Sequence, residues 1–208
     1  MISAVHADDF VESKRKGPPV EVRKAGMSDI PLILDLINGY AAKGIMLPRT
    51  EFEMAEAIRD FSVVVTREGE LLGCGALHFY SPTVAEIRSL AVAEPAKTHG
   101  VGRKVIEAII AEAKEYELDA VFAFTYVVDF FRKVGFEVVE RGVLPLKVWK
   151  DCVRCPKFHA CDEIAVLRVL RPERWHQTES PIWGQTQSAL DDLVQLPIPL
   201  GMNLIPPK

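Results

Sequence analysis

Ile87-Arg-Ser-Leu-Ala-Val-Ala-Glu-Pro-Ala-Lys-Thr-His-Gly-Val-Gly-Arg-Lys104 is the stretch that decides the fold. It predicts a strand, a short loop with two spaced glycines, and a helix that begins near Gly100. A helix N-terminus presents unpaired N–H groups and the positive end of the helix dipole, so it favours a bound anion. Gly100 and Gly102 let the backbone approach that anion closely. Cations also surround the glycines (Lys97, Arg103 and Lys104), so the stretch predicts a cradle for the pyrophosphate of a phosphate-bearing cofactor.

The segments on either side of this stretch predict a domain that mixes strands and helices. Apolar periodicity predicts strands over residues 21–25, 61–66, 71–79, 85–92, 120–125, 136–139 and 163–170, and helices over residues 30–42, 51–59, 101–116 and 129–133. This order is typical of an α/β (α+β) domain with a central mixed sheet flanked by about four helices.

The two ends of the chain differ from the middle. Residues 1–20 lack periodicity and predict a flexible lead-in, whereas residues 21–170 form the predicted domain. Residues 171–208 predict a proline-rich tail that is either disordered or docked as an extended strap. Trp175 and Trp183 favour docking, because disordered tails are usually poor in such residues.

Composition excludes several classes of function. The chain has 208 residues, a hydrophobic fraction of 49%, a net charge of −4 and a pI near 5.8. A nucleic-acid binder usually carries a basic face, so we expect no nucleic-acid partner. No run approaches the roughly 18–20 apolar residues of a membrane span, and the N-terminus lacks the apolar core of a secretory signal. We therefore expect a cytoplasmic protein without a membrane partner.

Two motifs in sequence order resemble the signatures of the GNAT acetyltransferases. Alone, the glycine loop is also compatible with an ordinary strand-to-helix connection, because neither G-x-G-x-x-G nor the Walker pattern is present. However, Lys97-Thr-His-Gly-Val-Gly102 resembles the acetyl-CoA pyrophosphate loop of that superfamily, and Phe130-Phe-Arg-Lys-Val-Gly-Phe136 resembles its second signature. The resemblance implies the GNAT fold and acetyl-CoA as the cosubstrate.

The resemblance also implies which residues hold acetyl-CoA: Leu90, Ala91, Val92, Lys97, Thr98, His99, Gly100, Val101, Gly102, Arg103 and Phe131. Two of them depart from the usual pattern. Lys97 replaces a glutamine or arginine, which we expect to weaken one phosphate contact. Phe131 stands where many members have a tyrosine that protonates the departing thiolate, and a phenyl ring has no proton to donate.

A narrower resemblance covers about residues 21–170. Residues 46–50, 73–78, 85–92 and 144–158 are similar to the short, stand-alone amino-acid N-acetyltransferases, which are similar to the acetyltransferase half of N-acetylglutamate synthase. That resemblance implies acetyl transfer to the α-amine of L-glutamate by direct attack in a ternary complex, the first step of arginine biosynthesis. The chain has no room for an amino-acid-kinase domain, so we expect no arginine feedback through one. The chain is also compatible with assembly as a homodimer.

This chemistry needs a base, a stabilised oxygen and a proton for sulfur. Glu86 is the candidate base, directly or through water; the alternative is a strand-end carboxylate paired with Arg88. The resemblance implies that a strand N–H, at Leu90 or its neighbour, stabilises the charge on the carbonyl oxygen. Thr125 and Tyr126 end the next strand and are candidates to protonate the sulfur, or else core or rim residues.

Glutamate carries two carboxylates, so its pocket needs cations, and arginine binds a carboxylate with two hydrogen bonds. Arg49 is the first candidate, because the Leu-Pro-Arg-Thr segment resembles the acceptor-side arginine motif of the synthases. Arg88 is second, and Lys147 is a weaker candidate. Both arginines are alternatively surface ion pairs, which stabilise by only about 0–1 kcal/mol.

Three of the four cysteines form a Cys152-x2-Cys155-x5-Cys161 pattern. A closed zinc site needs four ligands, and the fourth would be crowded beside Cys161, so we expect no metal. The alternatives are a cysteine-bearing lid over the acceptor pocket or a thiol switch. Cys74 lies in an apolar run and is expected to be a small buried residue.

Two other functions remain open from the sequence. The acceptor is set by a few pocket residues, so the chain is alternatively a GNAT enzyme for another amino acid or small amine. It is otherwise a non-catalytic acetyl-CoA-binding module, a reading that Phe131 supports. A cationic pocket beside Glu86 would favour the glutamate enzyme over both.

Overall fold

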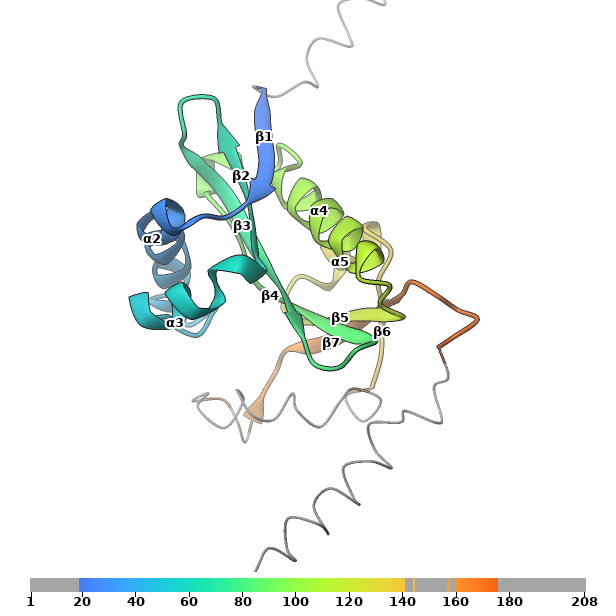
Figure 1. Ribbon diagram of the computed structural model, residues 1–208. Coiled ribbons are helices and arrows are strands. Elements are labelled where there is room, and N and C mark those ends of the chain that lie inside the picture. The colour runs from blue at the N-terminus through green and yellow to red at the C-terminus, as the bar shows by residue number, and fades with distance from the viewer. Residues whose placement is uncertain (1–18, 141–143, 145–156, 158–159, 176–208) are drawn as a thin grey trace, which may run out of the picture.

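The computed structural model describes residues 19–140, 144, 157 and 160–175. These residues form one sheet of seven strands in the order β1-β2-β3-β4-β5-β7-β6 (Figure 1). The strands are β1 (Val20–Lys24), β2 (Phe61–Thr66), β3 (Leu71–Phe79), β4 (Val84–Val92), β5 (Ala120–Thr125), β6 (Glu137–Val138) and β7 (Ile164–Val169). Neighbouring strands are antiparallel except for β4 and β5, which are parallel.

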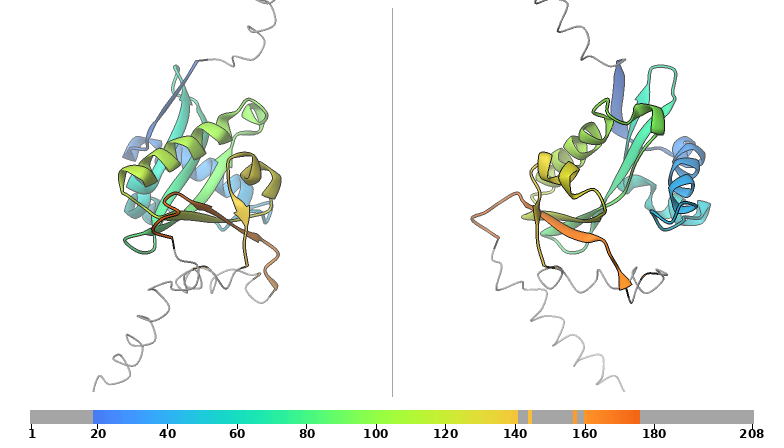
Figure 2. Two further views of the ribbon diagram at one scale, coloured as in Figure 1. Left: turned by 90° about the vertical axis from the view of Figure 1, so that its right-hand side faces the viewer. Right: turned by 180° about the vertical axis from the view of Figure 1, so that it is seen from behind.

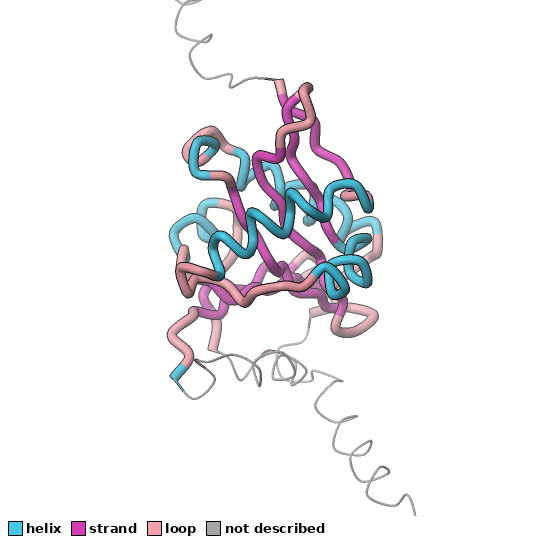
Figure 3. The backbone as a smooth tube through the Cα atoms, turned by 90° about the vertical axis from the view of Figure 1, so that its left-hand side faces the viewer, coloured by secondary structure: helices cyan, strands magenta, loops and turns pink. Residues whose placement is uncertain are grey.

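Helices cover both faces of the sheet (Figure 2, Figure 3). They are α2 (Ile30–Ala41), α3 (Glu51–Ala57), α4 (Val101–Glu115) and α5 (Val128–Lys133). In Figure 1, α2 and α3 lie to the left of the sheet, and α4 and α5 lie to the right. Each layer has its own apolar core, one between α4 and the sheet and one between the α2–α3 layer and the sheet.

This architecture confirms the predicted fold class, a mixed sheet flanked by four helices in the described part of the chain. The predicted element bounds agree with the structure to within about two residues. The second helix is predicted over residues 51–59 but is shorter in the structure. α3 stops at Ala57, and a 3-10 turn over Ile58–Asp60 leads into β2. None of the described helices has the length and apolar character that a bilayer span requires.

The two central strands part soon after they meet. β4 pairs with β5 only from Val84 to Glu86, while its pairing with β3 continues to Val92. β5 pairs with β7 on its other edge along its whole length, from Ala120 to Thr125, so it stays in the sheet after it leaves β4. Among the residues that the structure describes, the edge of β4 that faces β5 therefore has no strand partner from Ile87 onward, which leaves backbone groups there for a ligand.

A bulge lies in the same part of β4. Ala91 pairs with Cys74 and Arg88 pairs with Ala76, so two residues of β4 stand opposite one residue of β3. Ser89, inside the bulge, has a left-handed φ of 51°. This conformation is strained for a residue with a side chain, so the surrounding contacts must hold it.

The bulge changes which layer each side chain faces. Before it, Ala85 and Ile87 pack in the core beneath α4. After it, Ala91 packs in the core beneath α2 and α3. The extra residue of the bulge interrupts the alternation of side chains, so Arg88 and Ser89 both face the α2–α3 layer although they are adjacent in sequence.

Helix α4 lies unusually close to β3. A Cβ atom added at Gly75 would lie 2.8 Å from Val105 Cγ1 and 3.1 Å from Ile109 Cδ1. A Cβ atom added at Gly73 would lie 2.8 Å from Val101 Cγ1. The two glycines thus let the first turns of α4 pack directly on the strand backbone, which fixes the helix N-terminus beside the end of β4.

The described part of the tail is docked. The backbone N–H of Arg171 donates to Asp119 O at 3.1 Å, and the Arg171 side chain pairs with Glu117 at 3.2 Å. Trp175 packs against the apolar cluster on the α2–α3 side of β5 and β7. Residues 176–208 of the predicted tail and residues 1–18 of the predicted lead-in lie outside the described residues.

Gly75→Ala tests the close contact of α4 with β3. We expect a loss of about 1–3 kcal/mol in the free energy of unfolding, because the new methyl group overpacks the interface. Gly39→Ala is the control: it lies in α2 with no atom within 4 Å of the added Cβ. We expect it to stabilise by about 0.5–1 kcal/mol. Urea unfolding measures both, and equal stability of the two variants would contradict the packing argument.

Candidate active site

The loop before α4 has the shape of an anion cradle. Gly100 precedes the helix with φ 76° and ψ 6°, a left-handed conformation that glycine adopts without strain. Within the described part of the chain, the N–H groups of Gly100, Val101 and Gly102 donate no hydrogen bond. These groups and the dipole of a 15-residue helix converge on the space before α4. The geometry therefore suits the predicted pyrophosphate contact.

Lys97 has partners within the protein. Its Nζ lies 2.8 Å from Glu94 Oε1 and 5.2 Å from the centre of the Tyr40 ring. The hydrogen bond to Glu94 raises the pKa of Lys97. Tyr40 in turn donates its hydroxyl to Val92 O at 2.6 Å, which ties α2 to the end of β4. A phosphate contact of Lys97 stays a prediction.

The second signature contributes a ring that sequence reasoning did not single out. A Cβ atom added at Gly102 would lie 3.3 Å from Phe130 Cζ, so Phe130 borders the glycine loop. Phe131, the predicted cofactor contact, is 3% exposed and packs in the α4-side core. Its ring meets Phe136 edge to face at 5.2 Å. Adjacent aromatic residues on a short helix give no sequence signal for which ring faces the loop.

Glu86 lies in a hydrogen-bonded cluster on the α2–α3 side of β4. It is 8% exposed, and its Oε2 accepts from Arg88 Nε at 2.5 Å and from the Tyr80 hydroxyl at 3.0 Å. Arg88 also donates to the Tyr80 hydroxyl and lies over the Tyr80 ring. Glu86 and Arg88 are therefore paired, as the alternative reading of the sequence anticipated. The pairing leaves the role of Glu86 as a base a prediction.

Tyr80 is a functional candidate that sequence reasoning missed. It follows β3, and its ring packs against His78 and Phe122. The signal lay in the hairpin register: His78 pairs with Glu86, so Tyr80, two residues on, projects from the same face. Such a register follows from strand alternation only after the β3–β4 turn has been placed.

Arg49 lies on the same face as Glu86 and Arg88. It ends the loop between α2 and α3, and its Nε donates to Ser89 Oγ at 3.2 Å. The side chain of Asn38, in α2, forms hydrogen bonds with the backbone of Arg49. The structure thus brings the two predicted acceptor arginines and the predicted base to one face of β4, at the point where β5 departs.

Thr125 and Tyr126 lie at the end of β5, across the parting from β4. Thr125 is buried, and its Oγ1 accepts from Val127 N at 3.0 Å. The Tyr126 hydroxyl donates to Asp162 Oδ1 at 2.8 Å and accepts from Lys157 Nζ at 3.0 Å. Partial burial raises the pKa of Tyr126, so the phenol keeps its proton at neutral pH. Tyr126 therefore has a proton to donate, although its role as the acid is untested.

The remaining candidates fall into two groups. Lys147, Cys152 and Cys155 lie outside the described residues. Cys161 lies 3.9 Å from Glu163 Oε2, and the described residues contain no cluster of three or more potential metal ligands. Cys74 is fully buried, which raises the pKa of its thiol to about 12, and this confirms the prediction of a small buried residue.

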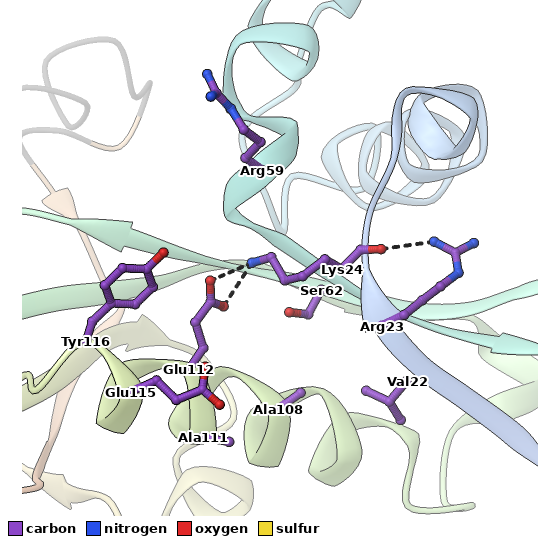
Figure 4. A pocket seen from close by; sticks show the side chains of 10 residues that line it. All are labelled: Val22, Arg23, Lys24, Arg59, Ser62, Ala108, Ala111, Glu112, Glu115 and Tyr116. Atoms are coloured by element: carbon purple, nitrogen blue, oxygen red, sulfur yellow. Dashed lines mark hydrogen bonds and ion pairs between the residues drawn. The ribbon is translucent and has the colours of Figure 1, made fainter.

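A separate groove of about 670 Å³ runs between β1 and α4 (Figure 4). Lys24 of β1 reaches across it and pairs with Glu112 of α4 at 2.7 Å. None of the predicted site residues lines this groove. It is a structural contact between the edge strand and the helix, away from the site.

Comparisons with known proteins identify the family of this chain. Residues 38–136 match the acetyltransferase (GNAT) family. The chain is 42% identical over 149 residues to an uncharacterized N-acetyltransferase of Chlorobaculum tepidum, covering 72% of this chain and 96% of the relative. It is 35% identical over 148 residues to the amino-acid acetyltransferase of Mycobacterium tuberculosis, and the match covers 70% of this chain and 83% of the relative.

Solved structures give the same result. N-acetylglutamate synthase from Neisseria gonorrhoeae, complexed with coenzyme A and N-acetyl-glutamate, superposes with a TM-score of 0.67 at 29% identity, covering 75% of this chain and 36% of that one. The chain thus spans about a third of that synthase. A Mycobacterium tuberculosis protein in complex with CoA superposes with a TM-score of 0.63 at 29% identity. The match covers 72% of this chain and 99% of that one.

Gly100→Ala tests the cradle before α4. Gly69 in the β2–β3 hairpin is a matched control, since both glycines have a positive φ (76° and 88°) and open space around the added Cβ. We expect each alanine to cost about 1 kcal/mol of stability through backbone strain. Only Gly100→Ala should weaken coenzyme A binding, by about tenfold, because it distorts the N–H groups. Calorimetric titration measures this, and equal affinity of both variants would contradict the cradle.

Proposed function

Because this chain belongs to the GNAT acetyltransferase family, we propose that it transfers the acetyl group of acetyl-CoA to the α-amine of L-glutamate. Its coarser activity is acetyl-CoA-dependent N-acetylation of an amino acid. One observation carries the finer assignment: Arg49 and the Glu86–Arg88 pair lie on one face of β4, beside the parting of β4 and β5. A cationic group next to a candidate base fits an acidic amino acid.

The residues present fit the acetyl donor. The N–H groups of Gly100, Val101 and Gly102 donate no hydrogen bond within the described residues, and a pyrophosphate would accept them. This edge of β4 has no strand partner among the described residues and offers further backbone groups near Leu90, which would hold the pantetheine arm, whereas Val92 O is already bonded to Tyr40. When bound, acetyl-CoA supplies a thioester carbonyl activated for attack by an amine.

Glu86 is the proposed base. Two donors on its Oε2 fix the orientation of the carboxylate, and its Oε1 accepts no hydrogen bond from the described residues. Oε1 is then the atom that receives a proton from the glutamate ammonium, directly or through one water. The neutral amine attacks the thioester carbon and a C–N bond forms. As the C–S bond breaks, the nitrogen gives its second proton to water, which balances the proton that the departing sulfur takes up.

Two further groups complete the proposed reaction. The N–H of Leu90, in the bulge where β4 has left β5, is proposed to stabilise the charge that develops on the carbonyl oxygen. The sulfur takes its proton from Tyr126, whose phenol stays protonated, or from Thr125 beside it. Arg49 binds a carboxylate of the acceptor. The product of the proposed reaction is N-acetylglutamate, which is the first acetylated compound of arginine biosynthesis.

A thiol-release assay with acetyl-CoA and a panel of amino acids tests this function. We expect glutamate to be the preferred acceptor. Glu86→Gln should lower kcat by about 100-fold or more, because the amide no longer accepts the proton. Arg49→Ala should raise the KM for glutamate by about tenfold or more. Arg59→Ala removes an exposed arginine next to β2 and should leave both values unchanged.

Three outcomes would contradict the proposal in different ways. Equal rates with lysine and glutamate would refute the acceptor assignment. Full activity of Glu86→Gln would refute the base assignment. Binding of acetyl-CoA without transfer to any amine would favour the non-catalytic module.

A further inference from the structure

Arg49 is held in place at its backbone. Asn38, in the third turn of α2, donates from Nδ2 to Arg49 O at 3.0 Å and accepts from Arg49 N at 2.9 Å through Oδ1. One amide side chain thus pairs with both polar groups of a single loop residue. This arrangement fixes the position and the rotation of the Arg49 backbone relative to α2.

Arg49 is also held at its side chain. Its Nε donates to Ser89 Oγ at 3.2 Å, and Ser89 is the bulge residue with φ 51°. Without the bulge, Ser89 would face α4, because side chains alternate along the strand. The strained conformation therefore places a hydroxyl on the α2–α3 side, where the guanidinium lies.

These two contacts share no atom and come from different elements. Asn38 belongs to a helix that packs on the sheet through its buried isoleucines, and Ser89 belongs to the central strand. Together they fix both ends of a long and otherwise adaptable side chain. A guanidinium fixed in this way loses less conformational entropy when a carboxylate binds.

We propose that Asn38 and Ser89 are specificity-determining positioning residues that hold the Arg49 guanidinium for the side-chain or α-carboxylate of the acceptor. The inference rests on the proposed function, in which Arg49 binds the acceptor. It assigns to Asn38 and Ser89 no contact with the reacting atoms. Their loss therefore affects acceptor binding and leaves the chemical step and the donor site unchanged.

Asn38→Ala tests the backbone contact. The KM for glutamate should rise by about tenfold, while kcat and the KM for acetyl-CoA change less than about threefold. Asn38→Asp keeps the bond from Arg49 N and loses the bond to Arg49 O, so its KM should rise less. Asp35→Ala is the control, since Asp35 is an exposed residue one turn earlier on the same helix. A tenfold fall in the kcat of Asn38→Ala, with an unchanged KM for glutamate, would overturn the assignment.

Ser89 allows a test that separates positioning from stability. Ser89→Ala and Ser89→Gly both remove the hydroxyl, so both should raise the KM for glutamate by about the same factor, roughly tenfold. Only glycine relieves the left-handed strain. Ser89→Gly should therefore melt at a higher temperature than Ser89→Ala. A KM that follows the melting temperature across the two variants would overturn the positioning role.

Failure of this inference is distinguishable from failure of the proposed function. If the wild-type protein acetylates no acidic amino acid, the proposed function fails, and the inference falls with it. If the wild-type protein does so and the Asn38 and Ser89 variants keep its KM for glutamate, the inference alone is refuted. A raised KM in both series, with donor binding unchanged, supports it.

Discussion

The parallel ladder between β4 and β5 ends at Glu86, and the rest of the site depends on that ending. Had the two strands stayed paired, the backbone groups of β4 would be satisfied within the sheet, and no ligand could use them. Because β5 diverges from β4 after Phe122 while it stays paired with β7, one edge of β4 is released in the middle of the domain. The glycine loop before α4 lies at the end of this released edge, and the candidate base lies at its start.

The bulge gives the same strand a second function. On the α4 side, β4 contributes to an apolar core; on the α2–α3 side, it presents Glu86, Arg88 and Ser89. An unbroken strand would place Ser89 on the α4 side and would leave the Arg49 loop without a partner on the sheet. The strained φ of one residue thus brings the proposed donor-binding edge and the proposed acceptor-binding face onto one short segment of backbone.

Much of this architecture could be predicted from the sequence, because it follows from local patterns. Apolar periodicity and turn residues located the strands and helices to within about two residues, and the spacing of Gly100 and Gly102 located the loop that leads into α4. Tyr80, Asn38, Phe130 and Ser89 were not found. Their roles depend on the register of the β3–β4 hairpin, on the bulge, and on which side of a short helix faces its neighbour. None of these is encoded in the identity of the residue itself.

The bare backbone at Gly73 and Gly75 has a consequence for how relatives of this protein diverge. A helix that rests directly on strand backbone is closely packed, so the proposed donor side shares one packed unit with the sheet. The proposed acceptor side, in contrast, includes a loop whose Arg49 bonds to Asn38 of α2 and to Ser89 of β4. Under the proposed function, substitutions in that loop would change the acceptor without disturbing the donor. Under the proposed function, this division would let the choice of amine change within one fold while the choice of acyl carrier stays the same.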